Sequence, residues 1–216
     1  MQISFLLLAC GCGLTAGTSL WPSPASVTFS DGVFALPPSF NFTSDTPTPI
    51  LSRAFARYLA ILGIRIEPLS PTAAAVVGTI ASLAVTLQTV DEALAFNTSE
   101  AYELRVAAGG ATLTADTVFG ALRGLETFSQ LTEFSTHAGG AVTRAAVVRD
   151  APRFRHRGAL VDTSRHFVGV PTLLSFLDAM AYNKLNVFHW HIVECVWRAR
   201  TPPKPWPSHA TALRPR

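Results

Sequence analysis

The chain has 216 residues, of which 49% are hydrophobic and 14% are charged, with a formal net charge of +3 and a pI near 9.0. Its 14 Phe and 4 Trp provide enough apolar surface for one or two folded domains, which excludes a chain that is disordered throughout. The basic charge lies in the last 22 residues, which carry +5, while the other 194 carry −2. Because the body of the chain has no basic field, we expect no nucleic-acid partner.

A largely apolar run over residues 3–10 opens the chain and is followed by a stretch rich in glycine and other small residues up to Ser19. The run is shorter than the ~20 residues that span a bilayer, and it is typical of a secretory signal. We therefore expect residues 1–19 to be a signal peptide, with a buried N-terminal strand as the alternative. No other stretch of the sequence predicts a membrane span.

Two sequons and the cysteine usage agree with export. Asn41 and Asn97 each begin an Asn-x-Ser/Thr acceptor and are the candidate glycosylation sites. Cys10 and Cys12 would leave with the signal, so Cys195 alone remains and no internal disulfide is expected. These features predict a secretory-pathway protein, with the lysosome, the vacuole or the extracellular space as its destination.

Residues 20–148 predict an α+β domain with helices on one face of a mainly antiparallel sheet. Helical spacing of apolar residues covers 50–62, and Gly63 is expected to end that helix. A second helix is expected to begin with Asp116 as its N-terminal cap. Its apolar face is formed by Val118, Leu122, Leu125 and Phe128.

Short strands are expected between these two helices, over residues 83–87, 102–106 and 111–114. The Gly109-Gly110 pair predicts a hairpin turn between the last two of them. Residues 136–140 predict a loop, after which the pattern changes.

Residues 149–194 predict a β-α-β unit. A strand over 158–161 ends at Asp162, Pro171 opens a helix that ends near Asn183, and a second strand covers 186–190. We expect the strands to be parallel with a right-handed crossover, as at the start of a (β/α) barrel or a doubly wound sheet. One side of the helix carries Leu173, Leu174, Leu177 and Met180.

Polar residues collect just past the carboxyl ends of both strands, where parallel α/β proteins build their active sites. They are Asp162, Thr163, Ser164, Arg165 and His166 after the first strand, and His191 and Glu194 after the second. The planar guanidinium of Arg165, with its several N–H donors, could bind neighbouring hydroxyls or a carboxylate of a ligand. Alternatively, it could form a salt bridge to a nearby acid.

Two other patterns have simpler interpretations. His189 and His191 share one side of a strand and could ligate a metal, but two ligands are too few, and we interpret them as core or supporting residues. Asp91-Glu92 is the only adjacent carboxylate pair, a feature of interest for glycosidases, and its polar context indicates a solvated surface pair. The sequence thus predicts no metal site and no cofactor.

The β-α-β segment resembles a known family. The runs PRFRHRG, DTSRH and DAMAYNKLNVFHWHIV, within residues 152–193, are similar to the first barrel segment of the β-N-acetylhexosaminidases of glycoside hydrolase family 20. Leu20-Trp21-Pro22 and residues 119–130 resemble the mature start and the closing helix of that family's N-terminal domain. The resemblance therefore covers roughly residues 20–193 in continuous order.

The resemblance implies an exo-acting, retaining hydrolase that removes terminal N-acetylglucosamine or N-acetylgalactosamine from glycoconjugates. In this family the 2-acetamido oxygen of the substrate attacks the anomeric carbon, an Asp orients that group, and the adjacent Glu protonates the leaving oxygen. Arg165 matches the arginine that grips the sugar's 3- and 4-hydroxyls. Glu194 stands where the family has an Asp that bonds a sugar hydroxyl. A Glu at this position keeps a carboxylate acceptor but places it one methylene further from the backbone.

The catalytic Asp-Glu pair lies in the family within a His-x-Gly-Gly-Asp-Glu motif, which these 216 residues do not contain. A complete barrel needs ~250 residues, so we expect only the start of one over 149–194, with no catalytic residue in the chain and no activity in isolation. The Pro- and Arg-rich residues 195–216 are expected to be a disordered tail outside the family. The alternative function is a non-catalytic module, residues 20–148, that pairs with a full-length subunit.

Overall fold

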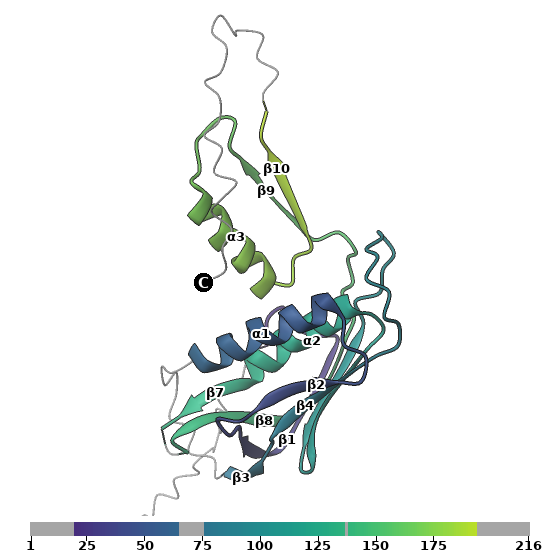
Figure 1. The fold of residues 1–216 in the computed structure, drawn as a ribbon, viewed down its shortest axis with the longest axis vertical. Helices are drawn as coiled ribbons and strands as arrows, with labels where there is room; N and C mark the ends of the chain where they lie inside the picture. The colour runs from purple at the N-terminus through teal and green to yellow at the C-terminus, as the bar shows by residue number, and fades with distance from the viewer. Residues whose placement is uncertain (1–19, 65–75, 137, 194–216) are drawn as a thin grey trace, which may run out of the picture.

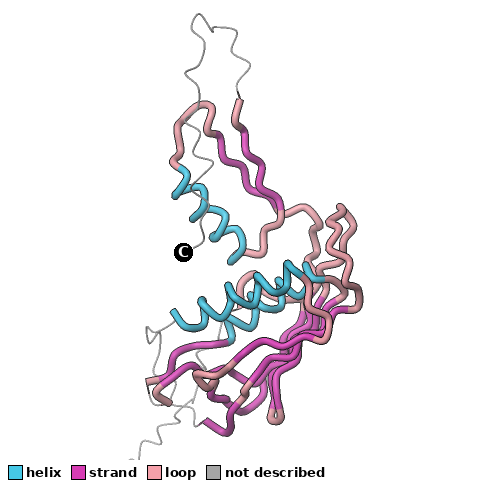
Figure 2. The backbone as a smooth tube through the Cα atoms, viewed as in Figure 1, coloured by secondary structure: helices cyan, strands magenta, loops and turns pink. Residues whose placement is uncertain are grey.

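The computed structural model describes residues 20–64, 76–136 and 138–193, so the expected signal peptide and tail lie outside the described residues. Two units are visible in Figures 1 and 2: an eight-stranded sheet that carries two helices on one face, and a smaller β-α-β unit beyond those helices. The elements of the first unit are β1 (Ser26–Ala35), β2 (Asn41–Ser44), α1 (Pro49–Ile64), β3 (Val76–Thr79), β4 (Ser82–Leu87), β5 (Tyr102–Ala107), β6 (Gly110–Ala115), α2 (Val118–Leu131), β7 (Thr132–Ser135) and β8 (Gly140–Asp150). Those of the second are β9 (Gly158–Asp162), α3 (Val170–Tyr182) and β10 (Val187–His191).

The sheet of the first unit is mixed, where we expected it to be mainly antiparallel. Its strand order is β2-β4-β6-β5-β8-β1-β3, with β7 also paired to β8. The pairs β1 with β3, β2 with β4, and β4 with β6 are parallel. The strands of these parallel pairs are not consecutive in the chain: α1 and β3 lie between β2 and β4, which leaves enough chain for β4 to run in the same direction as β2. The β5–β6 hairpin turns at Gly109 and Gly110, both at positive φ, as expected.

Both predicted helices are present, with different ends. Helix α1 continues through Gly63 to Ile64, so that glycine does not end it. Helix α2 is capped by Thr117 rather than Asp116: the Thr117 hydroxyl accepts the backbone N–H groups of Phe119 and Gly120. Asp116 instead accepts the hydroxyl of Ser99 at 2.6 Å. Of the three helices in the described ranges, none is long and apolar enough to cross a membrane.

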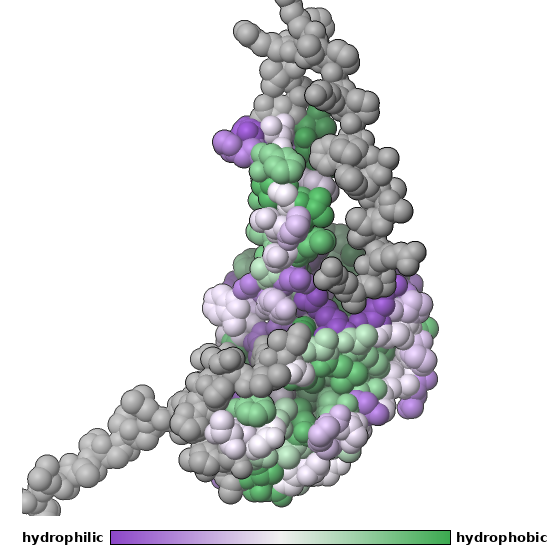
Figure 3. Space-filling view, turned by 60° about the vertical axis from the view of Figure 1, so that its left-hand side comes forward, coloured by the Kyte–Doolittle hydropathy of each residue, from purple (hydrophilic) through white to green (hydrophobic). Residues whose placement is uncertain are grey.

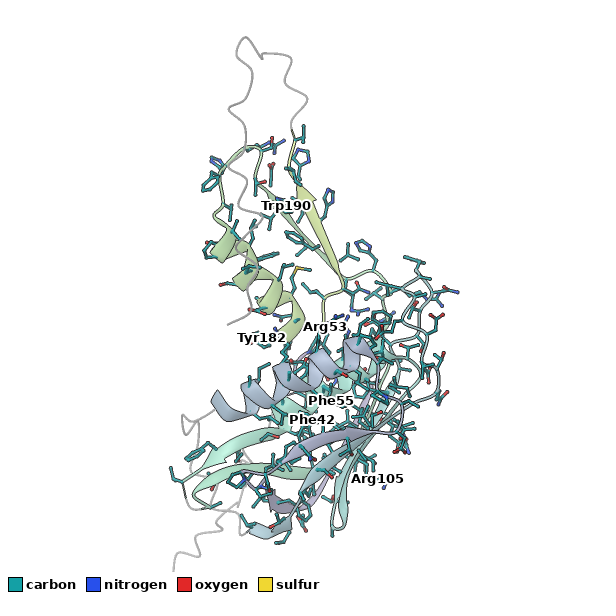
Figure 4. The ribbon with its side chains drawn as sticks, in the orientation of Figure 1. Phe42, Arg53, Phe55, Arg105, Tyr182 and Trp190 are labelled. Atoms are coloured by element: carbon teal, nitrogen blue, oxygen red, sulfur yellow. The ribbon has the colours of Figure 1, made fainter. Side chains whose placement is uncertain are left out.

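The core of the first unit lies between the sheet and these two helices. Four phenylalanine rings meet there: Phe42 lies 5.3 Å from both Phe40 and Phe55, and Phe40 stacks on Phe128 at 5.7 Å. Figure 4 labels Phe42 and Phe55 between β2 and α1. Buried and more exposed residues alternate along β4, β5 and β6, because one face of each strand packs against this core.

The second unit has the expected order, with β9 parallel to β10 and α3 between them. Its apolar residues are less completely covered. On α3, Leu173 and Met180 are buried, while Leu174 and Leu177 are exposed. Phe188 of β10 packs 6.0 Å from Phe176.

Helix α2 lies so close to the segment before β5 that a side chain at Gly120 would collide with it. A Cβ there would overlap the carbonyl oxygen of Ala101. We expect Gly120→Ala to lower the free energy of unfolding by ~1–3 kcal/mol, since backbone cannot move aside cheaply. Urea unfolding measures the change.

Gly63→Ala is the matched control, because a Cβ at Gly63 in α1 meets nothing within 4 Å. Better helix propensity should leave that variant as stable as the parent or up to ~1 kcal/mol more stable. Equal behaviour of the two variants would contradict the close approach at Gly120.

Candidate active-site edge

The carboxyl ends of β9 and β10 lie side by side and point away from the eight-stranded sheet (Figure 1). Asp162 is opposite His191 in the register of the two strands. The Thr163 N–H donates to the carbonyl oxygen of His191 at 3.0 Å, and the Trp190 indole N–H donates to the Thr163 hydroxyl at 2.9 Å. The structure therefore brings Asp162 and Thr163, at the end of β9, beside His191, at the end of β10.

Asp162 shapes the loop that follows β9. Its Oδ1 accepts the backbone N–H groups of Ser164 at 2.9 Å and Arg165 at 3.1 Å. The bond from the Arg165 N–H is the main reason that the pKa of Asp162 lies below its ordinary value. Asp162 therefore remains ionised near neutral pH and fixes the backbone that carries Arg165.

The Arg165 side chain is 71% exposed at this edge. Its Nε lies 3.5 Å from Oδ2 of Asp162, so the salt bridge that the sequence left open as an alternative is present. A pair of this length with an exposed guanidinium contributes little to stability. The guanidinium is also accessible to a ligand, so the pairing does not exclude a role in binding.

The remaining candidates at the edge are less defined. His166 is exposed next to Arg165, and Glu194 lies outside the described residues. His191 is half-buried, whereas His189 is exposed and is not a core residue. In the ranges that the structure describes, no three His, Cys, Asp or Glu side chains form a metal site.

The Asp91-Glu92 pair lies far from this edge in sequence and has a structural role. Glu92 accepts the backbone N–H of Ile50 at 2.8 Å, in the first turn of α1. Hydrogen bonds from Thr48 and Ile50 lower the pKa of Glu92. Asp91 is exposed, as expected, while Glu92 also stabilises the positive end of the α1 dipole.

The opposite edge, where β9 and β10 begin, is joined to the first unit through Glu100. The Glu100 carboxylate accepts Nε–H of Arg123 at 2.6 Å, an N–H of Arg157, and the side-chain amide of Asn186 at 3.0 Å. Arg123 belongs to α2, whereas Arg157 and Asn186 precede β9 and β10. Burial alone would raise the pKa of Glu100, but the two arginines hold it below its ordinary value.

Lys184 makes a second connection from the turn between α3 and β10. Its Nζ donates to the Thr127 hydroxyl at 2.7 Å and to the Tyr102 hydroxyl at 3.0 Å, and lies 3.6 Å from Asp150. The residue is only 4% exposed. Burial lowers the pKa of the Lys184 ammonium, and Asp150 opposes that change.

Sequence reasoning missed both Glu100 and Lys184 as residues that connect the two units. The only hint in the sequence is that lysine is rare: Lys184 is one of two lysines among 17 basic residues. That signal does not identify Tyr102, Thr127 or Asp150 as partners, since the contacts join positions dozens of residues apart.

Comparison with known proteins identifies the family. A family model described as beta-acetyl hexosaminidase like matches residues 20–131. A second, the catalytic domain of glycosyl hydrolase family 20, matches residues 154–214. The chain belongs to glycoside hydrolase family 20. The second match runs through most of residues 195–216, which we expected to lie outside the family.

Individual relatives agree with this assignment. The chain is 40% identical over 187 residues to beta-hexosaminidase subunit beta of Mus musculus and 35% identical over 206 residues to subunit alpha of Bos taurus. The alignments cover 82% and 90% of this chain but 35% and 38% of those proteins, so the chain spans about a third of their length. A chitobiase of Flavobacterium johnsoniae superposes with a TM-score of 0.68 at 32% identity, over 81% of this chain and 27% of that one.

Replacing Glu100 tests the connection at the base of β9 and β10. Glu100→Gln leaves two guanidinium groups without their buried carboxylate, so we expect a loss of ~3 kcal/mol in the free energy of unfolding at pH 7. Since the pKa of Glu100 is depressed on folding, its contribution is complete above its ordinary pKa of 4.5 and declines as the pH falls through the folded value. The difference between parent and variant should therefore shrink below pH 4.5. Urea unfolding at several pH values measures it.

Glu103→Gln is the control, because Glu103 pairs with Arg149 and Arg105 on the surface of the sheet. It makes the same chemical change and should cost much less. A Glu100→Gln effect that is equal to the control, or constant between pH 7 and pH 3, would contradict the role of Glu100.

Proposed function

We propose that this chain is part of a β-N-acetylhexosaminidase that acts in the secretory pathway on terminal N-acetylglucosamine or N-acetylgalactosamine of glycoconjugates. The observation that carries the proposal is the shared carboxyl edge of β9 and β10, where Asp162 fixes the loop that exposes Arg165. Active sites of parallel α/β enzymes are built at this edge. Membership of the family and the names of the relatives support the same substrate class.

Within this proposal the chain contributes sugar binding and not the chemical step. Arg165 would hold the hydroxyls of the terminal sugar with its fork of donors, and Glu194 would accept from another hydroxyl. The acetamido oxygen of the substrate would attack the anomeric carbon, assisted by an Asp-Glu pair. That pair's motif is not among the 216 residues, so we propose that this chain alone does not hydrolyse glycosides.

The β9-α3-β10 unit is proposed to be the opening segment of a (β/α)8 barrel. Its partly covered apolar residues support this assignment, because further strands and helices of a barrel would pack on them. Leu160 and Trp190 on the strands and Leu174 on the helix are each about half exposed. Isolated soluble units seldom leave so many large apolar side chains uncovered.

The alternative function is a non-catalytic module that associates with a full-length hexosaminidase subunit. The complete core of the first unit favours it, because Leu83, Leu104, Leu113 and Phe128 are fully buried without help from another chain. This alternative predicts a monodisperse 216-residue protein that associates with such a subunit, as sedimentation or size exclusion would show. Aggregation of the purified chain would count against it.

Restoring a barrel tests the role of Arg165. In a fusion of residues 20–193 to the remaining barrel of a family member, we expect cleavage of an N-acetylglucosaminide, and none from the 216-residue chain. Arg165→Ala in the fusion should raise KM and lower kcat, together by about 10²-fold or more in kcat/KM, because the grip on remote hydroxyls aligns the reacting centre.

Arg155→Ala is the matched control for that experiment. It also removes an exposed arginine, but from the segment before β9, at the opposite edge. Its kinetics should match those of the parent fusion. Unchanged kinetics for Arg165→Ala would remove Arg165 from the site, and hydrolysis by the 216-residue chain would refute the division of roles.

The route through the secretory pathway is tested at the two sequons. Asn41 begins β2 and Asn97 lies in a turn closed by bonds between Ala95 and Thr98, and both asparagines are exposed. Expression in secretory cells should give a protein whose mass falls on treatment with an N-glycosidase. Asn41→Gln and Asn97→Gln should each remove one glycan, and a mass unaffected by the enzyme would contradict the proposed route.

A further inference from the structure

An open groove lies where the two units meet, beside the loop between β4 and β5. It has a volume of about 310 Å³. The loop contributes Leu94 and Phe96 to its lining, and the segment that leads into β9 contributes Arg155 and His156. All four residues are exposed, so a ligand in the groove can reach them.

The apolar part of this lining is unusually accessible to water. Phe96 is 75% exposed, and Leu94, two residues earlier, is 68% exposed. On the face of the junction that Figure 3 shows, by contrast, hydrophilic residues gather. Apolar residues scattered singly over a surface need no explanation, but these two line one groove together with the N–H donors of Arg155 and His156. An aromatic and aliphatic lining with a few polar groups is the composition of a small-molecule site.

A closed β-turn holds Phe96 beside an asparagine. The Thr98 N–H donates to the carbonyl oxygen of Ala95 at 3.1 Å, and the Ala95 N–H donates to the Thr98 hydroxyl at 2.8 Å. Phe96 and Asn97 are therefore the two central residues of the turn, and both are exposed. Because Phe96 and Thr98 line the groove, a group attached to Asn97 begins at its rim.

Asn97 is also the acceptor of a sequon, for which the proposed secretory route predicts an N-linked glycan. The first sugar of such a glycan is N-acetylglucosamine, bonded through its anomeric carbon to the asparagine amide nitrogen. The C–H bonds on one face of this sugar pack favourably on the negative face of an aromatic ring, while its hydroxyl and acetamido oxygens accept hydrogen bonds. The exposed Phe96 ring and the donors of Arg155 and His156 match these two parts of the sugar.

The other sequon provides a contrast within the same chain. Asn41 has a phenylalanine on each side, but both rings belong to the core: Phe40 stacks on Phe128 at 5.7 Å, and Phe42 stacks on Phe55 at 5.3 Å. A glycan on Asn41 therefore has no exposed ring in the residue before or after it.

We propose that the groove holds the first N-acetylglucosamine of a glycan on Asn97, with the apolar face of the sugar on the Phe96 ring and its polar groups on Arg155 and His156. The volume of about 310 Å³ is at the lower end of the roughly 300–1,000 Å³ of small-molecule sites, which suits one sugar. Because the turn belongs to the first unit and Arg155 leads into β9, the sugar links the two units. This role of Asn97 rests on the proposed route through the secretory pathway, and it concerns a sugar that the protein carries, not one that it cleaves.

Each sequon is tested alone in the 216-residue chain, expressed in secretory cells. Asn41→Gln leaves only the Asn97 glycan, Asn97→Gln leaves only the Asn41 glycan, and mass spectrometry measures the occupancy of each. Trimming either glycan to a single N-acetylglucosamine with an endoglycosidase should leave the melting temperature unchanged. Complete removal with an N-glycosidase should lower the melting temperature of the Asn41→Gln protein by roughly 2–4 °C, the shift expected for one aromatic contact in a chain of this length. The same treatment should leave the melting temperature of the Asn97→Gln protein unchanged.

Phe96→Ala removes the ring and leaves the acceptor sequon intact. Combined with Asn41→Gln, it should abolish the decrease, as a double-mutant cycle requires of two groups in contact. Proton NMR of the trimmed protein supplies a readout that does not depend on melting. The aromatic ring should move the resonances of the sugar protons above its face upfield, and Phe96→Ala should remove that displacement.

An equal decrease at both sequons, or a decrease that persists in Phe96→Ala, would overturn the proposal. A decrease that occurs already on trimming would place the contact beyond the first sugar and overturn it as well. A glycan on Asn41 with none on Asn97 would overturn this proposal while the secretory route stands. No glycan on either asparagine would contradict the route too.

Discussion

The position of β9 and β10 relative to the first unit depends on one buried carboxylate, Glu100. It holds Arg157 and Asn186, the residues that lead into the two strands, against Arg123 of α2. An ionised group in this position is stable only because its oxygens are fully used by charged and amide donors. Lys184 makes a second buried connection, this time with a positive charge: its ammonium donates to two hydroxyls of the first unit. The junction is therefore polar and specific in its geometry, where an apolar junction would tolerate sliding.

This construction separates stability from chemistry within the β-α-β unit. The amino ends of its strands are fixed to the first unit, and the carboxyl ends are left to carry an exposed cluster around Arg165. The same separation is general in parallel barrels, whose chemistry lies at the carboxyl face. In this chain the first unit supports the base of β9 and β10 through Glu100 and through the partners of Lys184. The loop after β9 is positioned by the N–H groups of Ser164 and Arg165, which donate to Asp162, and by the N–H of Thr163, which donates to His191.

Local patterns in the sequence predicted most elements, and contacts distant in sequence account for the errors. Gly109-Gly110 and Pro171 each indicate a specific backbone geometry, and the hairpin and the start of α3 follow from them. The cap of α2 was misplaced by one residue because Asp116 and Thr117 are both good caps, and Ser99 decides between them by engaging Asp116. The parallel pairs join strands that are not consecutive in the chain, and periodicity does not reveal which strands become neighbours. The cluster of Asp162 and Arg165 was predictable because both residues lie within a few positions of the end of one strand. By contrast, nothing in the sequence near Lys184 identifies Tyr102 as its partner.

The state of Asp162 limits what this edge can do chemically. A general acid must keep its proton near the working pH, which in carboxylic acids requires burial or a neighbouring negative charge to raise the pKa. Asp162 has the reverse environment, since backbone N–H groups and Arg165 lower its pKa and occupy its oxygens. It is therefore suited to orient the loop and not to protonate a leaving group. The described residues between β9 and α3, and the two after β10, contain no other carboxyl group, so no described side chain of these loops can be that acid.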